Sequence, residues 1–237
     1  IATDYVCIPF WEETNPDYFV IPSEELKEDF KSKGIPEEKL LPFGIPTAKV
    51  YREEYDKKEY KEKLNFKVNE KYILILTGSM GFGNITEMIN KMQNEIKNVN
   101  FIVSCGHNEE VYNILKERCK NTNNIIILPF TNNISNYMKA SDIILSKPGG
   151  LTTTEIATLR KPFIHTMPIP GCENYNAKFF ESRNMSIKCD TIEEVIQKTK
   201  KLLKDKTLQN QMIENQKKYI KKDACDKISD VVIREMQ

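Results

Sequence analysis

Short apolar runs alternate with helical patterns along most of the chain. Lys71 to Thr77 (KYILILT) is a continuous apolar run of strand length, and apolar residues recur at helical spacing between Ile85 and Ile96. Four similar units follow, with strands predicted at 100–104, 125–128, 142–146 and 162–166 and helices at 109–119, 134–140, 151–159 and 173–183. This alternation predicts an α/β fold with a doubly wound, Rossmann-like parallel sheet and helices on both faces.

The two ends of the chain differ from this repeating part. Residues 1–50 look like the last βα unit of another domain, with a strand at 17–21 and a helix that Ser23 caps. Residues 51–70 are charged and predict a linker with a short helix, 71–205 form the main domain, and 206–237 hold a C-terminal helix from Leu208 to Met236. Since the chain begins at Ile1 rather than Met, we expect a fragment whose other Rossmann-like domain is truncated.

Charge and cysteine content exclude several classes of protein. The chain has 35 Lys and Arg against 34 Asp and Glu, so bulk electrostatics give no reason to expect a nucleic-acid binder. No apolar run has the length needed to span a bilayer. The six cysteines are scattered and the two histidines are not spaced as metal ligands, which favours a reduced cytosolic protein without structural zinc.

The first candidate ligand loop is Gly78 to Gly83, directly after the Lys71–Thr77 strand. Its order, G-x-x-G-x-G, is not the dinucleotide fingerprint, and no acidic residue ends the second strand, which argues against a nicotinamide enzyme. The glycines allow the backbone to approach an anion at the following helix N-terminus. A bare tight turn explains this loop equally well.

The second candidate loop, Lys147 to Glu155, carries two adjacent glycines and then three threonines. This pattern predicts a phosphate site at a helix N-terminus. Thr152 and Glu155 also fit a capping box, which leaves the glycine pair unexplained. Two such loops in one domain indicate a nucleotide diphosphate ligand.

The segment Lys147 to Phe180, KPGGLTTTEIATLRKPFIHTMPIPGCENYNAKFF, closely resembles the donor-binding segment of a known family. It is similar to GT-B glycosyltransferases of family 28 type, related to bacterial processive diacylglycerol glucosyltransferases and plant monogalactosyldiacylglycerol synthases. A more distant relative is the peptidoglycan GlcNAc transferase that makes lipid II. The similarity includes residues 76–81, 104–108 and 128–131, and residues 3–5, 17–23 and 43–46 resemble the end of the family's N-terminal domain.

The resemblance implies roles for residues at matching positions. Backbone groups of Phe130 and Thr131 would hold uracil, and Glu155 would accept hydrogen bonds from the ribose hydroxyls. Glu173 and Asn176 would face the hexose. The diphosphate would bind two groups of loop residues, namely Ser79, Met80, Gly81, Phe82 and Gly83 with Gly149, Gly150, Leu151 and Thr152.

The activity implied is inverting transfer of glucose or galactose from a UDP-sugar to diacylglycerol or a glycosyldiacylglycerol. The implied location is the cytoplasmic face of the cell membrane, held peripherally. The catalytic base and the membrane-docking surface would lie in N-terminal sequence outside this chain, so we expect the chain to bind donor without turnover. No DxD pair occurs in the sequence, and we expect neither a metal nor another cofactor.

One position departs from the family pattern, because Cys172 stands where relatives commonly have glutamine in PGQE. The sugar therefore stays open between glucose and galactose. A UDP-GlcNAc transferase acting on a polyprenyl-linked acceptor, a related epimerase and a noncatalytic UDP-sugar sensor are the alternatives. We expect His107 to be a loop residue and His165 a satisfied core residue.

Overall fold

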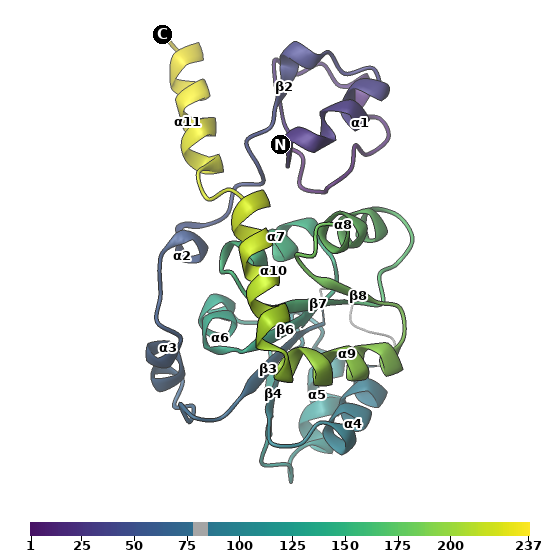
Figure 1. Ribbon diagram of the computed structural model, residues 1–237, viewed down its shortest axis with the longest axis vertical. Coiled ribbons are helices and arrows are strands. Elements are labelled where there is room, and N and C mark those ends of the chain that lie inside the picture. Colours follow the sequence, from purple (N-terminus) through teal and green to yellow (C-terminus); the bar gives the residue numbers. More distant parts are fainter. Residues whose placement is uncertain (78–84) are drawn as a thin grey trace.

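A six-stranded parallel sheet forms the centre of the computed structural model, which describes residues 1–77 and 85–237 (Figure 1). The strand order is β5-β4-β3-β6-β7-β8, which confirms the doubly wound fold. The strands are β3 (Tyr72–Leu76), β4 (Asn100–Ser104), β5 (Ile125–Leu128), β6 (Ile143–Ser146), β7 (Phe163–Thr166) and β8 (Ile187–Cys189). The predicted ligand residues Ser79, Met80, Gly81, Phe82 and Gly83 lie outside the described residues.

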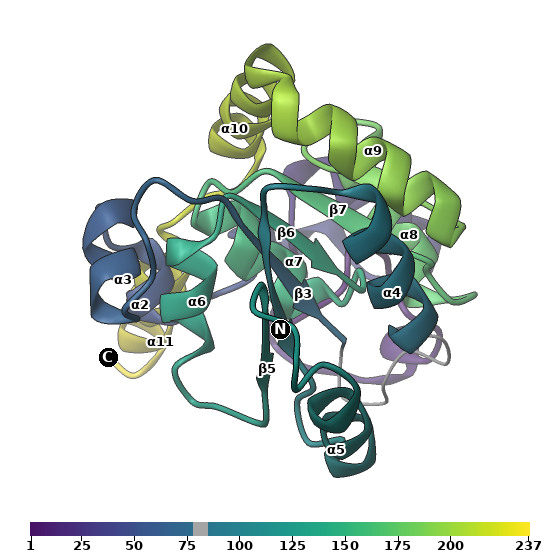
Figure 2. The same cartoon turned by 90° about the horizontal axis from the view of Figure 1, so that it is seen from below.

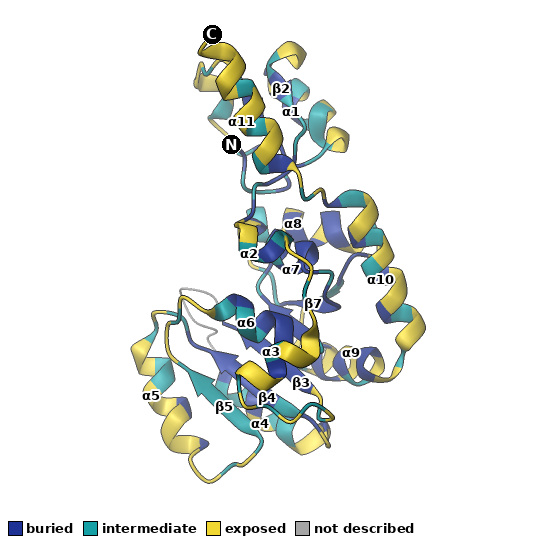
Figure 3. Ribbon diagram, turned by 90° about the vertical axis from the view of Figure 1, so that its left-hand side faces the viewer, coloured by how far each residue is buried: buried dark blue, intermediate teal, exposed yellow. Residues whose placement is uncertain are grey.

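Helices cover both faces of this sheet, as the alternating pattern predicts. The helices that follow the strands are α4 (Ile85–Glu95), α5 (Glu109–Arg118), α6 (Ile134–Ala140), α7 (Gly150–Thr158), α8 (Cys172–Glu181) and α9 (Ile192–Lys204). Helices α4 and α9 lie side by side (Figure 2). Together with α5 they cover one face, and α6, α7 and α8 cover the other (Figure 3). Every residue of β3 is buried, which explains why its sequence is continuously apolar instead of alternating.

Residues at the start of the chain form a small unit with its own core. The unit contains two short parallel strands, β1 (Phe19–Val20) and β2 (Leu40–Leu41). It also contains helix α1 (Lys27–Ser32) and the 3-10 turns η1 (Trp11–Glu13), η2 (Glu24–Leu26) and η3 (Glu37–Lys39). Ser23 caps η2, where its Oγ accepts from the Glu25 N–H at 3.4 Å. A separate apolar cluster that includes Phe30 and Ile21 fills this unit.

The segment between this unit and the sheet carries α2 (Lys49–Arg52) and α3 (Lys57–Lys63). The buried Lys61 ammonium donates to the carbonyl oxygens of Glu70 (2.6 Å) and Val68 (3.2 Å). Lys57 pairs with the Asp142 carboxylate at 2.5 Å, and the same carboxylate accepts from the Tyr72 N–H at 2.9 Å. The segment is therefore fastened to the sheet at the beginning of β3 and β6.

The C-terminal residues form two helices, so the prediction of one helix from Leu208 to Met236 is wrong. Helix α10 (Lys206–Tyr219) ends before Ile220, whose backbone is extended, and α11 (Ala224–Glu235) begins after a short turn. Ile220 itself is buried in the main core. Helix α11 lies beside the N-terminal unit (Figure 1), where Tyr18 donates to Glu235 Oε1 at 3.1 Å.

Among the residues that the structure describes, none of the helices is both long and apolar enough to cross a bilayer.

Candidate functional site

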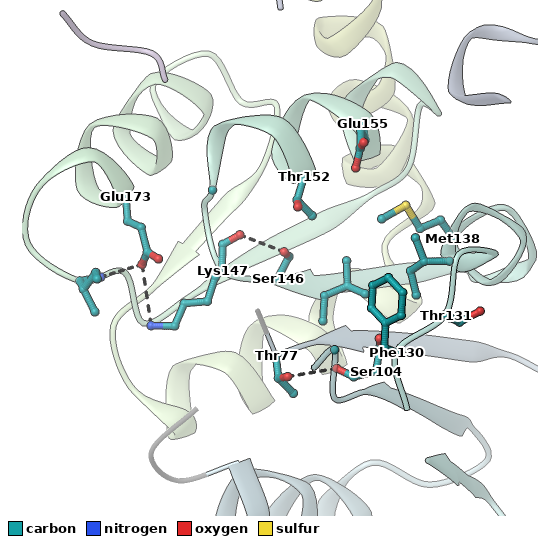
Figure 4. Close-up of a pocket in the computed structure, with 15 residues that line it drawn as sticks. Thr77, Ser104, Phe130, Thr131, Met138, Ser146, Lys147, Thr152, Glu155 and Glu173 are labelled. Atoms are coloured by element: carbon teal, nitrogen blue, oxygen red, sulfur yellow. Dashed lines mark hydrogen bonds and ion pairs between the residues drawn. The ribbon is translucent and has the colours of Figure 1, made fainter. Parts of the chain in front are cut away.

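A cavity of about 420 Å³ opens at the carboxyl ends of β3, β4 and β6 (Figure 4). In a doubly wound sheet this edge is where the strand order reverses and where ligands bind. Residues of the sheet, of the loops after the strands and of helices α6, α7 and α8 line the cavity: Leu76, Thr77, Ser104, Gly106, Phe130, Thr131, Ile134, Met138, Ser146, Lys147, Gly149, Thr152, Glu155, Ile169 and Glu173. The carboxyl-edge position makes this cavity the best candidate for a ligand site.

The N-terminus of α7 forms one wall of the cavity. Gly149 is its N-cap, and the first backbone hydrogen bond of the helix runs from the Thr153 N–H to the Gly149 carbonyl at 2.9 Å. The N–H groups of residues 150–152 precede that bond and point out of the helix end, as at any α-helix N-terminus. The positive end of the helix dipole adds to their attraction for an anion.

Thr152 and Glu155 lie on the face of α7 that borders the cavity (Figure 4). Their spacing of three residues places both side chains on one side of the helix. The capping-box explanation of these two residues is wrong, because Thr152 lies inside α7 and the helix has no side-chain cap. Both side chains are thus available to a ligand in the cavity.

Glu155 is a partly buried carboxyl group. Burial raises its pKa to about 7, and the neighbouring Tyr51 hydroxyl opposes part of that rise. Tyr51 comes from α2, far earlier in the chain, and is itself buried. Burial and the neighbouring Glu155 raise the pKa of Tyr51 to about 12, so it remains a neutral donor.

Glu173 and Lys147 face each other on the side of the cavity away from Glu155 (Figure 4). Glu173, in the first turn of α8, accepts from the Ile169 N–H at 2.9 Å, and Lys147 Nζ lies 3.8 Å from the same carboxylate. The Lys147 ammonium also donates to the Met167 carbonyl at 2.5 Å. This side of the cavity therefore combines a carboxylate that can accept from hydroxyls with a nearby positive charge.

Phe130 and Thr131 come from the loop between β5 and α6. Phe130 is 50% exposed although it lines the cavity, and it shares that side with the apolar residues Ile134 and Met138. Thr131 holds its own turn, since its Oγ1 accepts from the Asn133 N–H at 3.1 Å. This side can receive a flat group with apolar faces.

Three predicted ligand residues in the described part of the chain do not line the cavity. Leu151 is half exposed, and Gly150 is buried against the N-terminal segment. A Cβ at Gly150 would come within 1.8 Å of the Thr3 carbonyl oxygen, so close packing explains this glycine. Asn176 is fully buried, and its side chain bonds to the Tyr5 N–H (2.6 Å), Asp4 Oδ1 (2.7 Å) and the Pro148 carbonyl (2.9 Å).

The two histidines have different settings. His165 is buried with both ring nitrogens hydrogen-bonded, to Thr153 at 3.2 Å and to Ser186 at 3.1 Å, which confirms that it is a satisfied core residue. Burial lowers its pKa to about 3, so the ring is neutral. His107 is exposed on the loop after β4. Within residues 1–77 and 85–237, no cluster of three or more His, Cys, Asp or Glu side chains is arranged to hold a metal ion.

Sequence reasoning missed several residues of the cavity. Ser104 and Ser146 are the last residues of β4 and β6, and Thr77 directly follows β3. A small polar residue at the end of an apolar strand could have predicted these positions, because the carboxyl ends of parallel strands share one edge of the sheet. Tyr51 had no such signal, since it contacts Glu155 only through the tertiary fold.

Comparison with known proteins agrees with this fold and this resemblance. Residues 72–228 match the model of the glycosyltransferase family 28 C-terminal domain, and residues 1–47 match that of monogalactosyldiacylglycerol (MGDG) synthase. A processive diacylglycerol beta-glucosyltransferase from Staphylococcus carnosus is 29% identical over 215 residues, which cover 90% of this chain and 55% of that protein. The chain spans between 51% and 61% of the length of the first curated relatives that it matches.

Two solved structures share the fold. Acinetobacter baumannii MurG superposes with a TM-score of 0.70 at 17% identity, covering 98% of this chain and 65% of that one. The S. aureus MnaA–UDP co-structure superposes with a TM-score of 0.71 at 18% identity, covering 93% of this chain and 60% of that one. The match of the family model extends over most of the chain and includes the whole cavity edge of the sheet. The chain therefore belongs to the glycosyltransferase family 28 C-terminal domain family, on a GT-B type fold.

Proposed function

We propose that this chain binds the donor sugar nucleotide of a UDP-hexose:diacylglycerol hexosyltransferase. The transferase moves glucose or galactose, with inversion, to diacylglycerol or a glycosyldiacylglycerol. The observation that carries the proposal is the cavity wall at α7, where a helix N-terminus, Thr152 and Glu155 meet at the carboxyl edge of the sheet. The relatives named as processive diacylglycerol beta-glucosyltransferases support the acceptor class.

The proposed placement of the donor follows the chemistry of the cavity walls. The uracil lies at Phe130 and Thr131, and the ribose hydroxyls donate to the Glu155 carboxylate, which can accept from two vicinal hydroxyls at once. The diphosphate lies at Gly149 and the following N–H groups of α7. The hexose lies beside Glu173, on the side of the cavity that holds Lys147.

In this placement the site stabilises the charge that grows on the leaving diphosphate. The α7 N–H groups are fixed before reaction, so they stabilise the developing negative charge without reorganising. The Lys147 ammonium adds a positive charge on the Glu173 side of the cavity. We propose that the transferase needs neither a metal nor another cofactor, because the sequence has no DxD carboxylate pair.

The proposal also concerns the lipid acceptor and the membrane. The relatives are longer than the part matched here. We place the base that activates the acceptor hydroxyl, and the surface that meets the cytoplasmic membrane face, in their unmatched part. The chain itself then binds donor without turning it over.

Isothermal titration calorimetry with UDP-glucose, UDP-galactose, UDP-GlcNAc and ADP tests the proposal. We expect one UDP-hexose to bind more tightly than UDP-GlcNAc and ADP. Glu155→Ala should weaken that binding about tenfold or more, because two hydrogen bonds to a charged acceptor are lost. Glu193→Ala, which changes an exposed glutamate on α9, is the matched control and should bind like the wild type.

Two results contradict the proposal. Preference for UDP-GlcNAc would assign the chain to a GlcNAc transferase or an epimerase. Binding of no uridine nucleotide would show that the cavity is not a donor site.

A further inference from the structure

Two aromatic side chains from neighbouring loops stack on each other at the edge of the cavity. The His107 and Phe130 rings lie with their centroids 3.9 Å apart and their planes inclined by 20°. His107 follows β4 and Phe130 follows β5, and these strands are parallel neighbours in which Ser104 lies opposite Leu128. The two loops therefore leave the sheet side by side.

Hydrogen bonds within each loop hold this stack. In the His107 loop, the Asn108 N–H donates to the Cys105 carbonyl at 3.1 Å, and Asn108 Oδ1 accepts from the Val111 N–H at 2.9 Å. Gly106 makes the turn with a φ of +56°, a conformation that favours glycine. In the Phe130 loop, the Asn133 N–H donates to Thr131 Oγ1 at 3.1 Å. Each ring thus stands on a hydrogen-bonded turn.

The stack explains how a half-exposed phenyl ring can form a fixed wall of a binding site. Phe130 has 50% of its surface exposed, so core packing alone does not immobilise it. The His107 imidazole covers one side of the ring, while Phe130 still lines the cavity. An aromatic ring held in this way offers a stacking surface to a flat nucleobase.

We propose that His107 is a positioning residue for the nucleobase of the donor, because it holds the Phe130 ring in the orientation that the base packs against. The proposal rests on the donor-binding function above and adds a residue to it. His107 acts through Phe130, and any flat aromatic side chain at this position performs the same task.

Calorimetry with three probes tests the proposal: UDP, uridine and inorganic pyrophosphate. His107→Ala removes the stacked ring, and His107→Phe keeps a flat ring without the imidazole. Asn113→Ala, an exposed position on α5, is the matched control. We expect His107→Ala to weaken UDP and uridine binding by the same factor, about 2- to 10-fold, which is the usual range for one aromatic pair. Pyrophosphate binding should not change, and His107→Phe should restore the wild-type affinity.

Three results overturn the proposal. Unchanged uridine binding by His107→Ala would show that the imidazole does not matter. An equal loss of pyrophosphate affinity would show a general disturbance of the loops. Failure of His107→Phe to restore UDP and uridine affinity would show that a flat ring at this position does not orient Phe130. If the wild type binds neither UDP nor uridine, the proposed function fails as well; if it binds both and only the variants disagree, the stack alone is refuted.

Discussion

Glu155 is the residue whose environment most affects the proposed chemistry. Burial raises the pKa of its carboxyl group to about 7, although the neighbouring Tyr51 hydroxyl opposes part of the rise. Near neutral pH the cavity therefore exists in two protonation states. The ionised carboxylate accepts from both ribose hydroxyls, whereas the protonated acid replaces one acceptor by a donor.

This shift predicts that donor affinity depends on pH. If only the ionised form binds, UDP-glucose should bind about tenfold more weakly at pH 6 than at pH 8, because the ionised fraction falls as the pH drops through a pKa of about 7. UDP-glucose is the suitable probe because its diphosphate, unlike a terminal phosphate, has no proton to gain in this window. Calorimetry at several pH values measures the slope, and an equal slope in Glu155→Gln would assign it to another group.

At the scale of the elements, the attachment of α10 depends on one arginine. The Arg160 guanidinium, in the loop after α7, donates to the carbonyl oxygens of Gln216 (2.5 Å) and Ile220 (3.0 Å) at the end of α10. The Gln216 carbonyl also accepts from the Ile220 N–H at 2.9 Å, whereas the Ile220 carbonyl lies just past the end of the helix. Gln216 adds two bonds from its Nε2, to the carbonyl oxygens of Lys161 and Met185, both at 2.9 Å.

Arg160→Ala should lower the free energy of unfolding by about 2 kcal/mol, because the buried Gln216 and Ile220 carbonyls each lose the hydrogen bond from the charged Arg160 side chain. For a chain of this size the thermal midpoint should fall by about 4–8 °C. Arg234→Ala on α11, whose arginine is exposed, should change the midpoint by less than about 2 °C. Equal midpoints for Arg160→Ala and the wild type would contradict this account of α10.

How far the sequence predicts each element depends on where its contacts lie. Strand β3 could be predicted because burial on both faces makes it continuously apolar. The end of α10 could not, since no glycine or proline follows Tyr219 and the Arg160 side chain that bonds to the Gln216 and Ile220 carbonyls comes from a distant part of the chain. Thr152 and Glu155 could be placed in the site because both lie on one turn of α7, whereas Tyr51 reaches Glu155 from a different part of the chain.

At the scale of the whole molecule, the N-terminal segment is locked onto the sheet domain beside the cavity. Asn176 joins Asp4 and Tyr5 to Pro148, the residue before the glycine pair. The Tyr5 hydroxyl lies 2.8 Å from Thr154 Oγ1, which itself donates to the Gly150 carbonyl at 2.7 Å. The position of the α7 N-terminus is thus tied to the first residues of the chain.

Asn176→Asp should destabilise the chain by about 3 kcal/mol or more, because both amide donors are lost and a second carboxylate then faces Asp4. The thermal midpoint should fall by about 6–12 °C. Adding Asp4→Asn removes the repulsion and returns a donor to the pair, so the double variant should recover part of the loss. If the double variant lost as much free energy of unfolding as the two single variants together, residues 4 and 176 would not interact directly.

The central claim is that the cavity at the carboxyl edge of the sheet is the donor site. A crystal structure of the chain with UDP tests it most directly. We expect the diphosphate at the N-terminus of α7, the ribose hydroxyls on Glu155 and the base against Phe130. UDP bound anywhere else on the molecule, or bound in this cavity with its phosphates away from α7, would contradict it.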